Sequence, residues 1–293
     1  MPLFRKKSQS QADRLLDWRS GALSRGATTL EGLGPLLEEL GLTATQERRG
    51  WHTEIGDGGR LFISTVADGT TLSAWTPLED SHDAGQLAEL LRRNLDSVLA
   101  WAALGDDGEG GHDLGARIAI PLDGFERASV LLGLESIAGA AGDQALAARA
   151  REARDPARGE LAEQAGDERG RAAVQGALDA LDLSAETDAE RAGVWRVAVE
   201  RGTVEAVLRD TGESLMLLYE LEYTGGDADV ATLRWLLQAS EWNSSRLGLA
   251  SLPGGPGLFA ACVVPAHALE PQGLAWGLAA VLALRDDYDR LAQ

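Results

Sequence analysis

Two stretches of the sequence follow one pattern: QLAELLRRNLDSVLAWAALGDDGEGGHDLGARIAIPLDGFERASVLLGLESI (Gln86–Ile137) and TLRWLLQASEWNSSRLGLASLPGGPGLFAACVVPAHALEPQGLAWGLAAV (Thr232–Val281). Each stretch reads as a helix, a strand, a loop, a second strand and a long apolar helix. Matching residues recur 146 positions apart before the loop and 144 positions apart after it: Leu90 and Leu236, then Pro121 and Pro265, and Glu126 and Glu270. We therefore place a two-residue change in the loop between the strands. A repeat of this length predicts a duplicated domain rather than a solenoid, whose units have about 20 to 50 residues.

The segments that precede these stretches also repeat. In the first half, leucines at helical spacing precede three strand candidates: Gly50–Ile55, Arg60–Ala67 and Thr70–Pro77. In the second half, a helical pattern near Val174 precedes three more: Val194–Glu200, Val204–Arg209 and Ser214–Tyr223. Short links between such strands predict an antiparallel meander. The expected fold class is α+β, with two tandem α-β-β-β-α-β-β-α domains built on antiparallel sheets.

Four segments are expected along the chain. Residues 1–27 form a basic N-terminal arm, with six arginines and lysines against two aspartates, and are expected to be mobile. Residues 28–142 and 171–293 form the two repeats. Residues 143–170 lie between them and are poor in large apolar side chains, which predicts a mobile and partly helical spacer.

The net charge of the 293-residue chain is −19. A nucleic-acid binder needs a cationic surface that displaces counterions from phosphate, so this charge argues against direct nucleic-acid binding. It favours a basic protein partner, or a very soluble chain without one. The single cysteine, Cys262, excludes an internal disulfide, and its apolar strand predicts a buried thiol. No stretch has the length of a membrane helix and the N-terminus lacks a signal-peptide core, so we expect a cytoplasmic protein without a membrane partner.

No cluster of residues predicts a reaction. The loop from Gly105 to Asp113 is rich in Asp and Gly, but its oxygens do not follow the calcium-loop template, and we interpret it as a solvated hairpin loop. The four histidines share no metal-ligand spacing, and no nucleophile motif or phosphate-binding loop occurs. We expect no catalytic, cofactor-binding or metal-binding residues, and hence no enzyme.

The order of elements and three local features resemble the type III secretion chaperone fold and its YbjN-like relatives. The features are the passages from helix to strand (Leu90–Leu104 and Leu236–Ala250), the strands that end in proline (Ile118–Pro121 and Cys262–Pro265), and the Glu and Gly-Leu residues of the helix that follows. The resemblance covers both repeats and implies two tandem copies of this fold. It also implies capture of an extended segment of a client protein, with no catalysis by the fold itself. The pairing it implies is either an internal pseudo-dimer or a homodimer.

Four residues are the candidate contacts with a partner protein: Trp101, Trp235, Leu236 and Trp242. Trp101 lies in a strand that is apolar on both faces, which predicts either a fully covered sheet or a partner surface. The same two options apply to the helix that contains Trp235 and Leu236. Aromatic side chains are enriched at binding hot spots, whereas burial within the chain is the default for any one of them.

The sequence therefore favours a non-enzymatic, chaperone- or adaptor-like protein that holds a basic client by strand addition or groove capture. Nucleic-acid-binding proteins, and DNA-binding ones in particular, are one class of basic client that this charge suits. The alternative is a structural protein that associates only with itself through the same surfaces. An unrecognised enzyme would need a pocket with converging titratable groups, of which the sequence gives no sign.

Overall fold

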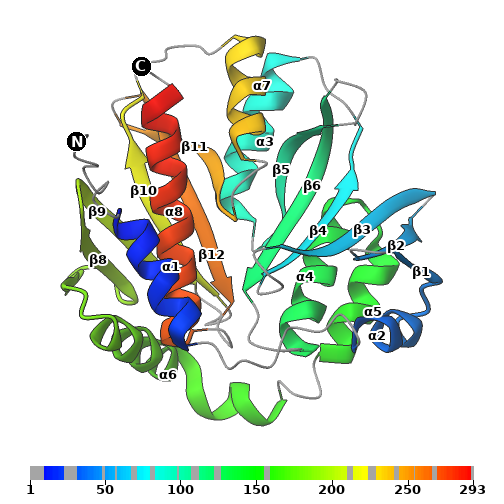
Figure 1. Ribbon diagram of the computed structural model, residues 1–293, viewed down its shortest axis with the longest axis horizontal. Coiled ribbons are helices and arrows are strands. Elements are labelled where there is room, and N and C mark those ends of the chain that lie inside the picture. Colours follow the sequence, from blue (N-terminus) through cyan, green and yellow to red (C-terminus); the bar gives the residue numbers. More distant parts are fainter. Residues whose placement is uncertain are drawn as a thin grey trace, which may run out of the picture.

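The computed structural model describes residues 10–22, 32–47, 50–56, 58–66, 71–79, 83–97, 99–106, 112–121, 127–154, 159–209, 214–223, 229–240, 244–253, 255–265 and 269–291. Within these ranges the chain forms two six-stranded antiparallel sheets and eight helices (Figure 1). The predicted α+β class with two antiparallel sheets is confirmed.

The two halves contain the same series of elements, apart from one additional helix, α5, at the end of the first half. The first half contains α2 (Leu33–Glu39), β1 (Ala44–Glu47), β2 (Gly50–Ile55), β3 (Gly59–Val66), β4 (Thr71–Pro77), α3 (Ala84–Asp96), β5 (Trp101–Asp106), β6 (His112–Pro121), α4 (Arg127–Ala140) and α5 (Gln144–Arg154). The second half contains α6 (Gly159–Ala180), β7 (Ala185–Thr187), β8 (Val194–Val199), β9 (Gly202–Leu208), β10 (Ser214–Leu221), α7 (Val230–Ala239), β11 (Arg246–Leu252), β12 (Gly255–Pro265) and α8 (Pro271–Leu291). Helix α1 (Gln11–Ala22) precedes both halves.

The strand order is also the same in the two sheets. The first sheet runs β1-β2-β3-β4-β6-β5, and the second runs β7-β8-β9-β10-β12-β11. Strand register shows which residues are equivalent: Trp101 pairs with Arg117 in the first sheet, as Arg246 pairs with Ala261 in the second. The counterpart of Trp101 is therefore Arg246, and the alignment of Trp101 with Leu247 that the sequence suggests is wrong by one residue. Two single-residue changes, one before and one after this strand, replace the single change expected in the loop.

Equivalent glycines bring the last helix of each half close to its sheet. A Cβ atom at Gly133 in α4 would lie 2.5 Å from Cδ1 of Ile120, and one at Gly277 in α8 would lie 2.6 Å from Cγ2 of Val264. Real Cβ atoms do not approach other carbons so closely. The Gly-Leu pairs that recur in the sequence thus mark the points where a helix meets its sheet.

Each half has one more strand before its middle helix than expected. The extra strands, β1 and β7, are four and three residues long and lie at the edges of the sheets. Their sequences, Ala-Thr-Gln-Glu and Ala-Glu-Thr, are mostly polar and exposed, so they lack the alternation that identifies a strand. The element order of each repeat is therefore α-β-β-β-β-α-β-β-α.

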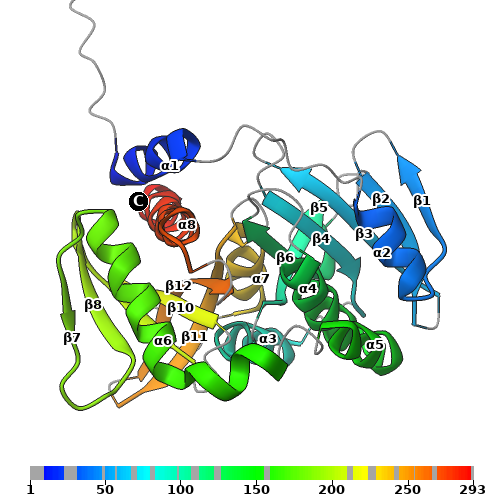
Figure 2. The same ribbon diagram turned by 90° about the horizontal axis from the view of Figure 1, so that it is seen from below.

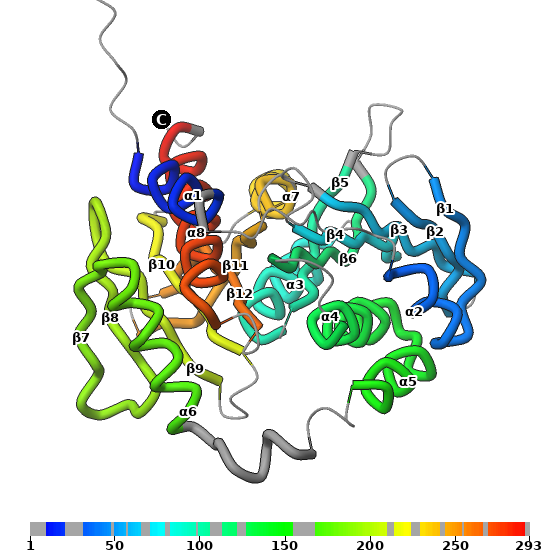
Figure 3. The backbone as a smooth tube through the Cα atoms, turned by 60° about the horizontal axis from the view of Figure 1, so that its bottom comes forward, coloured from blue at the N-terminus to red at the C-terminus, as the bar shows by residue number. Residues whose placement is uncertain are grey.

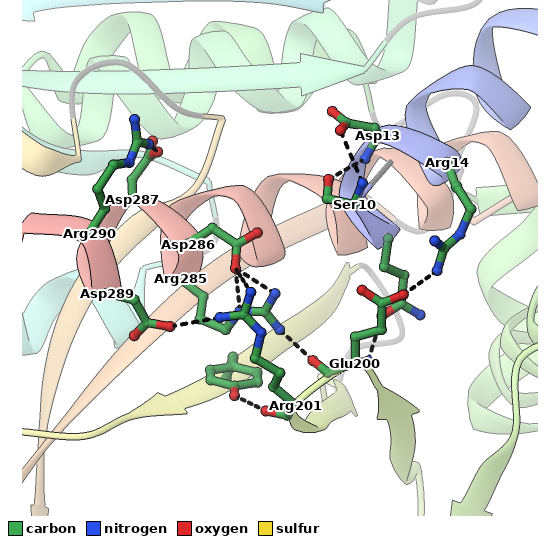
Figure 4. A network of polar contacts seen from close by, with 12 residues as sticks. Ser10, Asp13, Arg14, Glu200, Arg201, Arg285, Asp286, Asp287, Asp289 and Arg290 are labelled. Carbon is green, nitrogen blue, oxygen red and sulfur yellow. Dashed lines mark hydrogen bonds and ion pairs between the residues drawn. The ribbon is translucent and has the colours of Figure 1, made fainter. Parts of the chain in front are cut away.

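The described part of the basic N-terminal arm is a helix rather than a mobile segment. Helix α1 packs along α8 in the second half, with Ala12, Leu15 and Arg19 buried (Figure 2). Arg14 forms an ion pair with Glu200, whose backbone N–H also donates to the side chain of Gln11 at 2.7 Å (Figure 4). Arg14 holds the pKa of the Glu200 carboxyl below its usual value. Residues 1–9 and 23–27 lie outside the described residues.

The expected spacer, residues 143–170, is largely helical. Its first part, α5, packs against α4 and buries Leu146, Ala147 and Ala150 in the core of the first repeat. Asp143 begins α5 by accepting a hydrogen bond from the N–H of Leu146 at 2.9 Å. The second part belongs to α6, which continues without a break into the first helix of the second repeat. Little of this segment therefore acts as a separate linker in the described residues.

Two hydrophobic cores fill the molecule. One lies mainly within the first repeat, between its sheet and helices α2, α4 and α5. The other fills the second repeat and continues into the first, where it includes Leu87 and Leu91 of α3 and Trp101 of β5. The contact between the repeats is thus part of a continuous core.

Candidate protein-binding surfaces

The structure places the four predicted contact residues at or near the contact between the repeats. Trp101 is 5% exposed and Leu236 is 1% exposed, and both belong to the core that joins the repeats. Trp235 is half-buried and its ring lies 5.9 Å from that of Tyr288 in α8. Trp242 lies outside the described residues. The chain itself therefore occupies the surfaces of Trp101 and Leu236.

The repeats contact each other reciprocally. Helix α3 of the first repeat packs on β11 of the second, and helix α7 of the second packs on β5 of the first. Both helices lie between the two sheets and contact each other (Figure 3). Each begins at an aspartate cap in an equivalent position, where Asp83 accepts from the N–H of Gln86 and Asp229 from the N–H of Thr232.

Side chains at this contact occupy the edges of β5 and β11. Asn94 accepts from the N–H of Ala102 at 2.8 Å and donates to its carbonyl oxygen at 3.1 Å, and donates also to the carbonyl of Leu247 at 3.0 Å. Its counterpart Ser240 accepts from the N–H of Leu247 at 2.9 Å. An added strand would need these backbone groups. Strand addition at these positions of β5 and β11 is therefore blocked.

Two arginines of the second repeat bind the end of α3. Arg209 donates to the carbonyls of Leu95 and Asp96 at 2.7 and 2.9 Å, and Arg246 donates to those of Ser97 and Leu99 at 2.7 and 3.1 Å. A cation is favourable at the C-terminal end of a helix, where carbonyl oxygens lack partners. Burial lowers the pKa of Arg246 to about 9, so its guanidinium remains charged at neutral pH.

The outer half of the first sheet presents an open face. Register places one side chain from each of five strands in a row across this face: Thr45, His52, Phe62, Trp75 and Arg117. The ring of Phe62 lies 6.5 Å from that of His52 and 6.0 Å from that of Trp75. Phe62 is 39% exposed, one of four large apolar side chains in the described residues with such exposure. We refer to His52, Phe62 and Trp75 as the aromatic row.

A hollow of about 700 Å³ lies on this open face, beside the aromatic row. Its walls include Thr45, Glu47, His52, Glu54, Arg60 and Phe62 from strands β1, β2 and β3. Glu47 lies 3.1 Å from Nδ1 of His52. The hollow thus combines an aromatic floor with two carboxylates, beside the exposed edge strand β1.

The second sheet carries charged residues at two of the three equivalent positions, and Leu218 at the third, that of Trp75. Arg196 and Glu205 are the counterparts of His52 and Phe62, because the register of β8 and β9 matches that of β2 and β3. Glu205 forms an ion pair with Arg191 at 2.8 Å, and Asp188 pairs with both Arg191 and Arg196. Hydrogen bonds from the N–H of Glu190 and from Arg191 lower the pKa of Asp188. The aromatic row is therefore a property of the first repeat alone.

The sequence analysis did not predict the aromatic row, because it took burial as the default for aromatic side chains such as Trp75 and did not single out Phe62 or His52. The available signal was alternation: Leu61 and Ile63 are buried on one face of β3, which turns Phe62 to the other. Alternation identifies an outward aromatic residue in one strand, but only register brings three strands into a row.

The described residues contain no group of three or more His, Cys, Asp or Glu side chains that could hold a metal ion. Burial raises the pKa of the Cys262 thiol to about 12, which makes it a poor nucleophile. In the same part of the chain, none of the helices has the length and apolar character needed to cross a membrane.

Comparison with known proteins gives little further information. No protein-family model matches the chain, and no curated protein matches it. Among solved structures, the chain is similar to the crystal structure of YbjN from E. coli, with 16% sequence identity and a TM-score of 0.32, over 45% of this chain and 97% of that chain. A likeness of this size assigns no function to the chain.

Proposed function

We propose that this chain is a non-enzymatic protein-binding module of the chaperone or adaptor kind, which holds a segment of a client on the open face of its first sheet. The observation that supports this most strongly is the aromatic row, in which Phe62 is exposed and His52 and Trp75 are half-buried, whereas Trp101 and Leu236 are buried between the repeats. Aromatic side chains give large contact area at small entropic cost and are frequent binding anchors.

The client would bind as an extended segment along β1. This strand is exposed and lies at an edge of its sheet. Its outer backbone groups can therefore form hydrogen bonds with a strand that the client adds to the sheet. Apolar side chains of the segment would contact Phe62 and enter the 700 Å³ hollow. The edges at β5 and β11 would take no part, since Asn94 and Ser240 occupy them.

The charge of the chain supports a basic client. The net charge is −19, and the wall of the hollow has two carboxylates, Glu47 and Glu54, against one guanidinium, Arg60. Complementary charge speeds encounter and selects among partners more than it adds affinity. A client that itself binds nucleic acid is one such basic protein. Its binding should weaken as salt screens the charges.

The packing of the two repeats also bears on how many chains the protein contains. The reciprocal packing of α3 on β11 and α7 on β5 supports an internal pseudo-dimer, in which one chain supplies both halves of a pairing. Light scattering on the purified protein would then give the mass of one chain. A dimer would favour instead the alternative of a self-associating structural protein.

Photo-crosslinking from inside the native cell tests the binding surface. A photoreactive amino acid replaces Phe62 in one variant and Leu252 in a matched control, because both side chains are 39% exposed. We expect one crosslinked partner protein from position 62, lost when Trp75→Ala is added, and none from position 252. Crosslinks of position 62 to this chain alone would favour self-association. Equal products at both positions, or none at position 62, would reject the proposal.

A further inference from the structure

The inner face of the first sheet has a second hollow, of about 400 Å³, where α3, α4 and α5 meet the end strand β5. We refer to it as the inner hollow. Its lining is rich in alanine and also includes the polar side chains of Asn94, Ser97 and Ser136. The apolar lining residues include Leu90, Ala100, Ala102, Ala116, Ala140 and Ala147. Ala100, Ala102 and Ala147 are each 5 to 7% exposed, so the floor lies deep between the helices.

The second repeat has leucines at two positions where the first repeat has alanines in the lining of the inner hollow. Register makes Leu247 the counterpart of Ala102, because Leu247 pairs with Ala260 as Ala102 pairs with Ala116. The equivalence of Gly133 and Gly277 makes Leu284 the counterpart of Ala140. Leu247 and Leu284 are both 0% exposed. The first repeat therefore has two alanines where its sister repeat has two buried leucines.

A hydrogen bond closes the second repeat at the point where the first stays open. Ser245, directly before β11, donates from its hydroxyl to the carbonyl of Ala280 in α8 at 2.9 Å. The counterparts of these residues are Ala100 and Ser136, and both line the inner hollow. In the second repeat the helix is bound directly to the strand, whereas in the first the helix and the strand form opposite walls.

We propose that the inner hollow is a second binding site, which takes a leucine-type aliphatic side chain from a segment of a partner protein. The comparison with the sister repeat supports this ligand, because the sister repeat buries a leucine at each of the two positions where the hollow is lined by Ala102 and Ala140. Pockets that accept one anchor residue have an apolar floor with a few polar groups at the rim. Here the rim carries Arg93, Gln144 and the ion pair of Arg151 with Glu135 at 2.7 Å. These groups suit the polar backbone on either side of an anchor.

The inner hollow and the aromatic row lie on opposite faces of the first sheet, because Ala102 and Ala116 point to the face of α4 while Phe62 and Trp75 point away from it. The inference therefore goes beyond the proposed open-face site and does not depend on it. Phe62→Ser should leave binding in the inner hollow unchanged, while Ala102→Leu should leave the open-face crosslink unchanged.

The experiment uses the full-length protein labelled with ¹³C at the alanine methyl groups, since alanines form the floor. N-acetyl-leucinamide serves as the probe and N-acetyl-alaninamide, which lacks the isobutyl group, as the control ligand. We expect saturable shifts of the Ala100, Ala102 and Ala147 methyl signals at millimolar N-acetyl-leucinamide. The alanine analogue should shift the same signals at least tenfold less at equal concentration.

Ala102→Leu introduces into the hollow the residue that the second repeat has at this position, and it should abolish these shifts. Unchanged signals from the other alanines would show that the variant is folded. Ala140→Leu provides a second filling variant from the opposite wall, should the first fail to fold. Equal shifts with both ligands, shifts at other alanines only, or binding that survives in the filled variants would overturn the proposal. Binding of decanoate without binding of N-acetyl-leucinamide would also overturn the proposal, since the ligand of the hollow would then be a lipid chain.

Discussion

The guanidinium of Arg246 lies over the indole ring of Trp101, with Cζ 5.9 Å from the ring centroid, and the two residues occupy equivalent positions in the two repeats. Equivalent residues meet where two units pair through the same surface, as at the twofold axis of a dimer. The contact is also cation–π in character, since a guanidinium over an indole face is attracted by the ring. Arg246 and Trp101 thus mark the centre of the pairing between the repeats.

Arg246→Ala should destabilise the protein by about 3 kcal/mol, because it leaves buried carbonyl oxygens without a donor and opens a cavity beside Trp101. Urea unfolding monitored by tryptophan fluorescence would measure the change in the free energy of unfolding. Arg196→Ala is the control, since Arg196 is 57% exposed and its ion pair with Asp188 lies at the surface. Equal effects of the two substitutions would show that Arg246 does not stabilise the contact between the repeats.

Gly248→Ala should loosen the packing of α3 on β11. A Cβ atom at Gly248 would lie 2.5 Å from Cγ and Cδ2 of Leu95 and 3.1 Å from the carbonyl oxygen of Leu91. Because the neighbouring helix must move, we expect a loss of about 1 to 3 kcal/mol in unfolding free energy. Hydrogen exchange should show faster exchange in α3 while the distant strands β2 and β3 keep their protection. Unchanged exchange in α3 would contradict the close approach at Gly248.

The pH dependence of stability should include a contribution from Asp143. Hydrogen bonds from the N–H of Leu146 and, at 2.8 Å, from the N–H of Gly56 lower the pKa of this carboxyl in the folded protein. A carboxyl with a lowered folded-state pKa stabilises the protein above its unfolded value of about 3.9, and this stabilisation is lost as the pH falls through the folded value. Asp143→Asn should therefore cost about 1 kcal/mol at pH 7 and progressively less below pH 4.

Unfolding curves of both proteins between pH 7 and pH 3 would measure this difference. Asp179→Asn is a suitable control, because Asp179 lies on the exposed side of α6 with Gln175 as its partner. If the difference in unfolding free energy between Asp143→Asn and the parent protein stays constant with pH, the charge of Asp143 does not stabilise the start of α5.

Removal of residues 1–22 should lower the stability of the second repeat, because α1 buries Ala12 and Leu15 against α8. We expect a lower melting temperature and faster hydrogen exchange in α8, with exchange in α4 unchanged. Arg14→Ala alone should have little effect, since the Arg14 and Glu200 side chains are about half exposed. Full protection of α8 in the truncated protein would mean that α1 does not stabilise it.

The sequence predicted those parts of the fold that depend on local pattern. Strands such as β6 and β12 carry continuous apolar runs, and helices α3 and α7 carry a clear apolar stripe behind a capping aspartate, so their class and order could be read directly. The short strands β1 and β7 were missed. Edge strands of three or four exposed residues adopt an extended conformation by pairing with the neighbouring strand, not through a pattern in their own side chains.

The candidate site depended on contacts between distant segments, which one sequence does not contain. The two apolar faces of β5 predicted that either the chain itself or a partner would cover Trp101. They did not show that Arg246 and the carbonyl of Ser240, more than 130 positions away, would do so. In the same way, His52, Phe62 and Trp75 come together through the register of three strands. Register follows from the complete sheet and cannot be derived from any strand alone.

The pairing of Arg246 with Trp101 also bears on how such a chain could arise. In a symmetric dimer of one ancestral repeat, each residue at the axis meets its own copy, so this position would hold two indoles or two guanidiniums. Two buried arginines at that point would repel each other, and the described partners of Arg246 are carbonyl oxygens and an indole rather than carboxylates. An unlike pair at this place requires two units of different sequence, and the two halves of one chain meet that requirement. The same difference in sequence gives the first half an aromatic row while the second half carries Arg196 and Glu205 at the positions of His52 and Phe62.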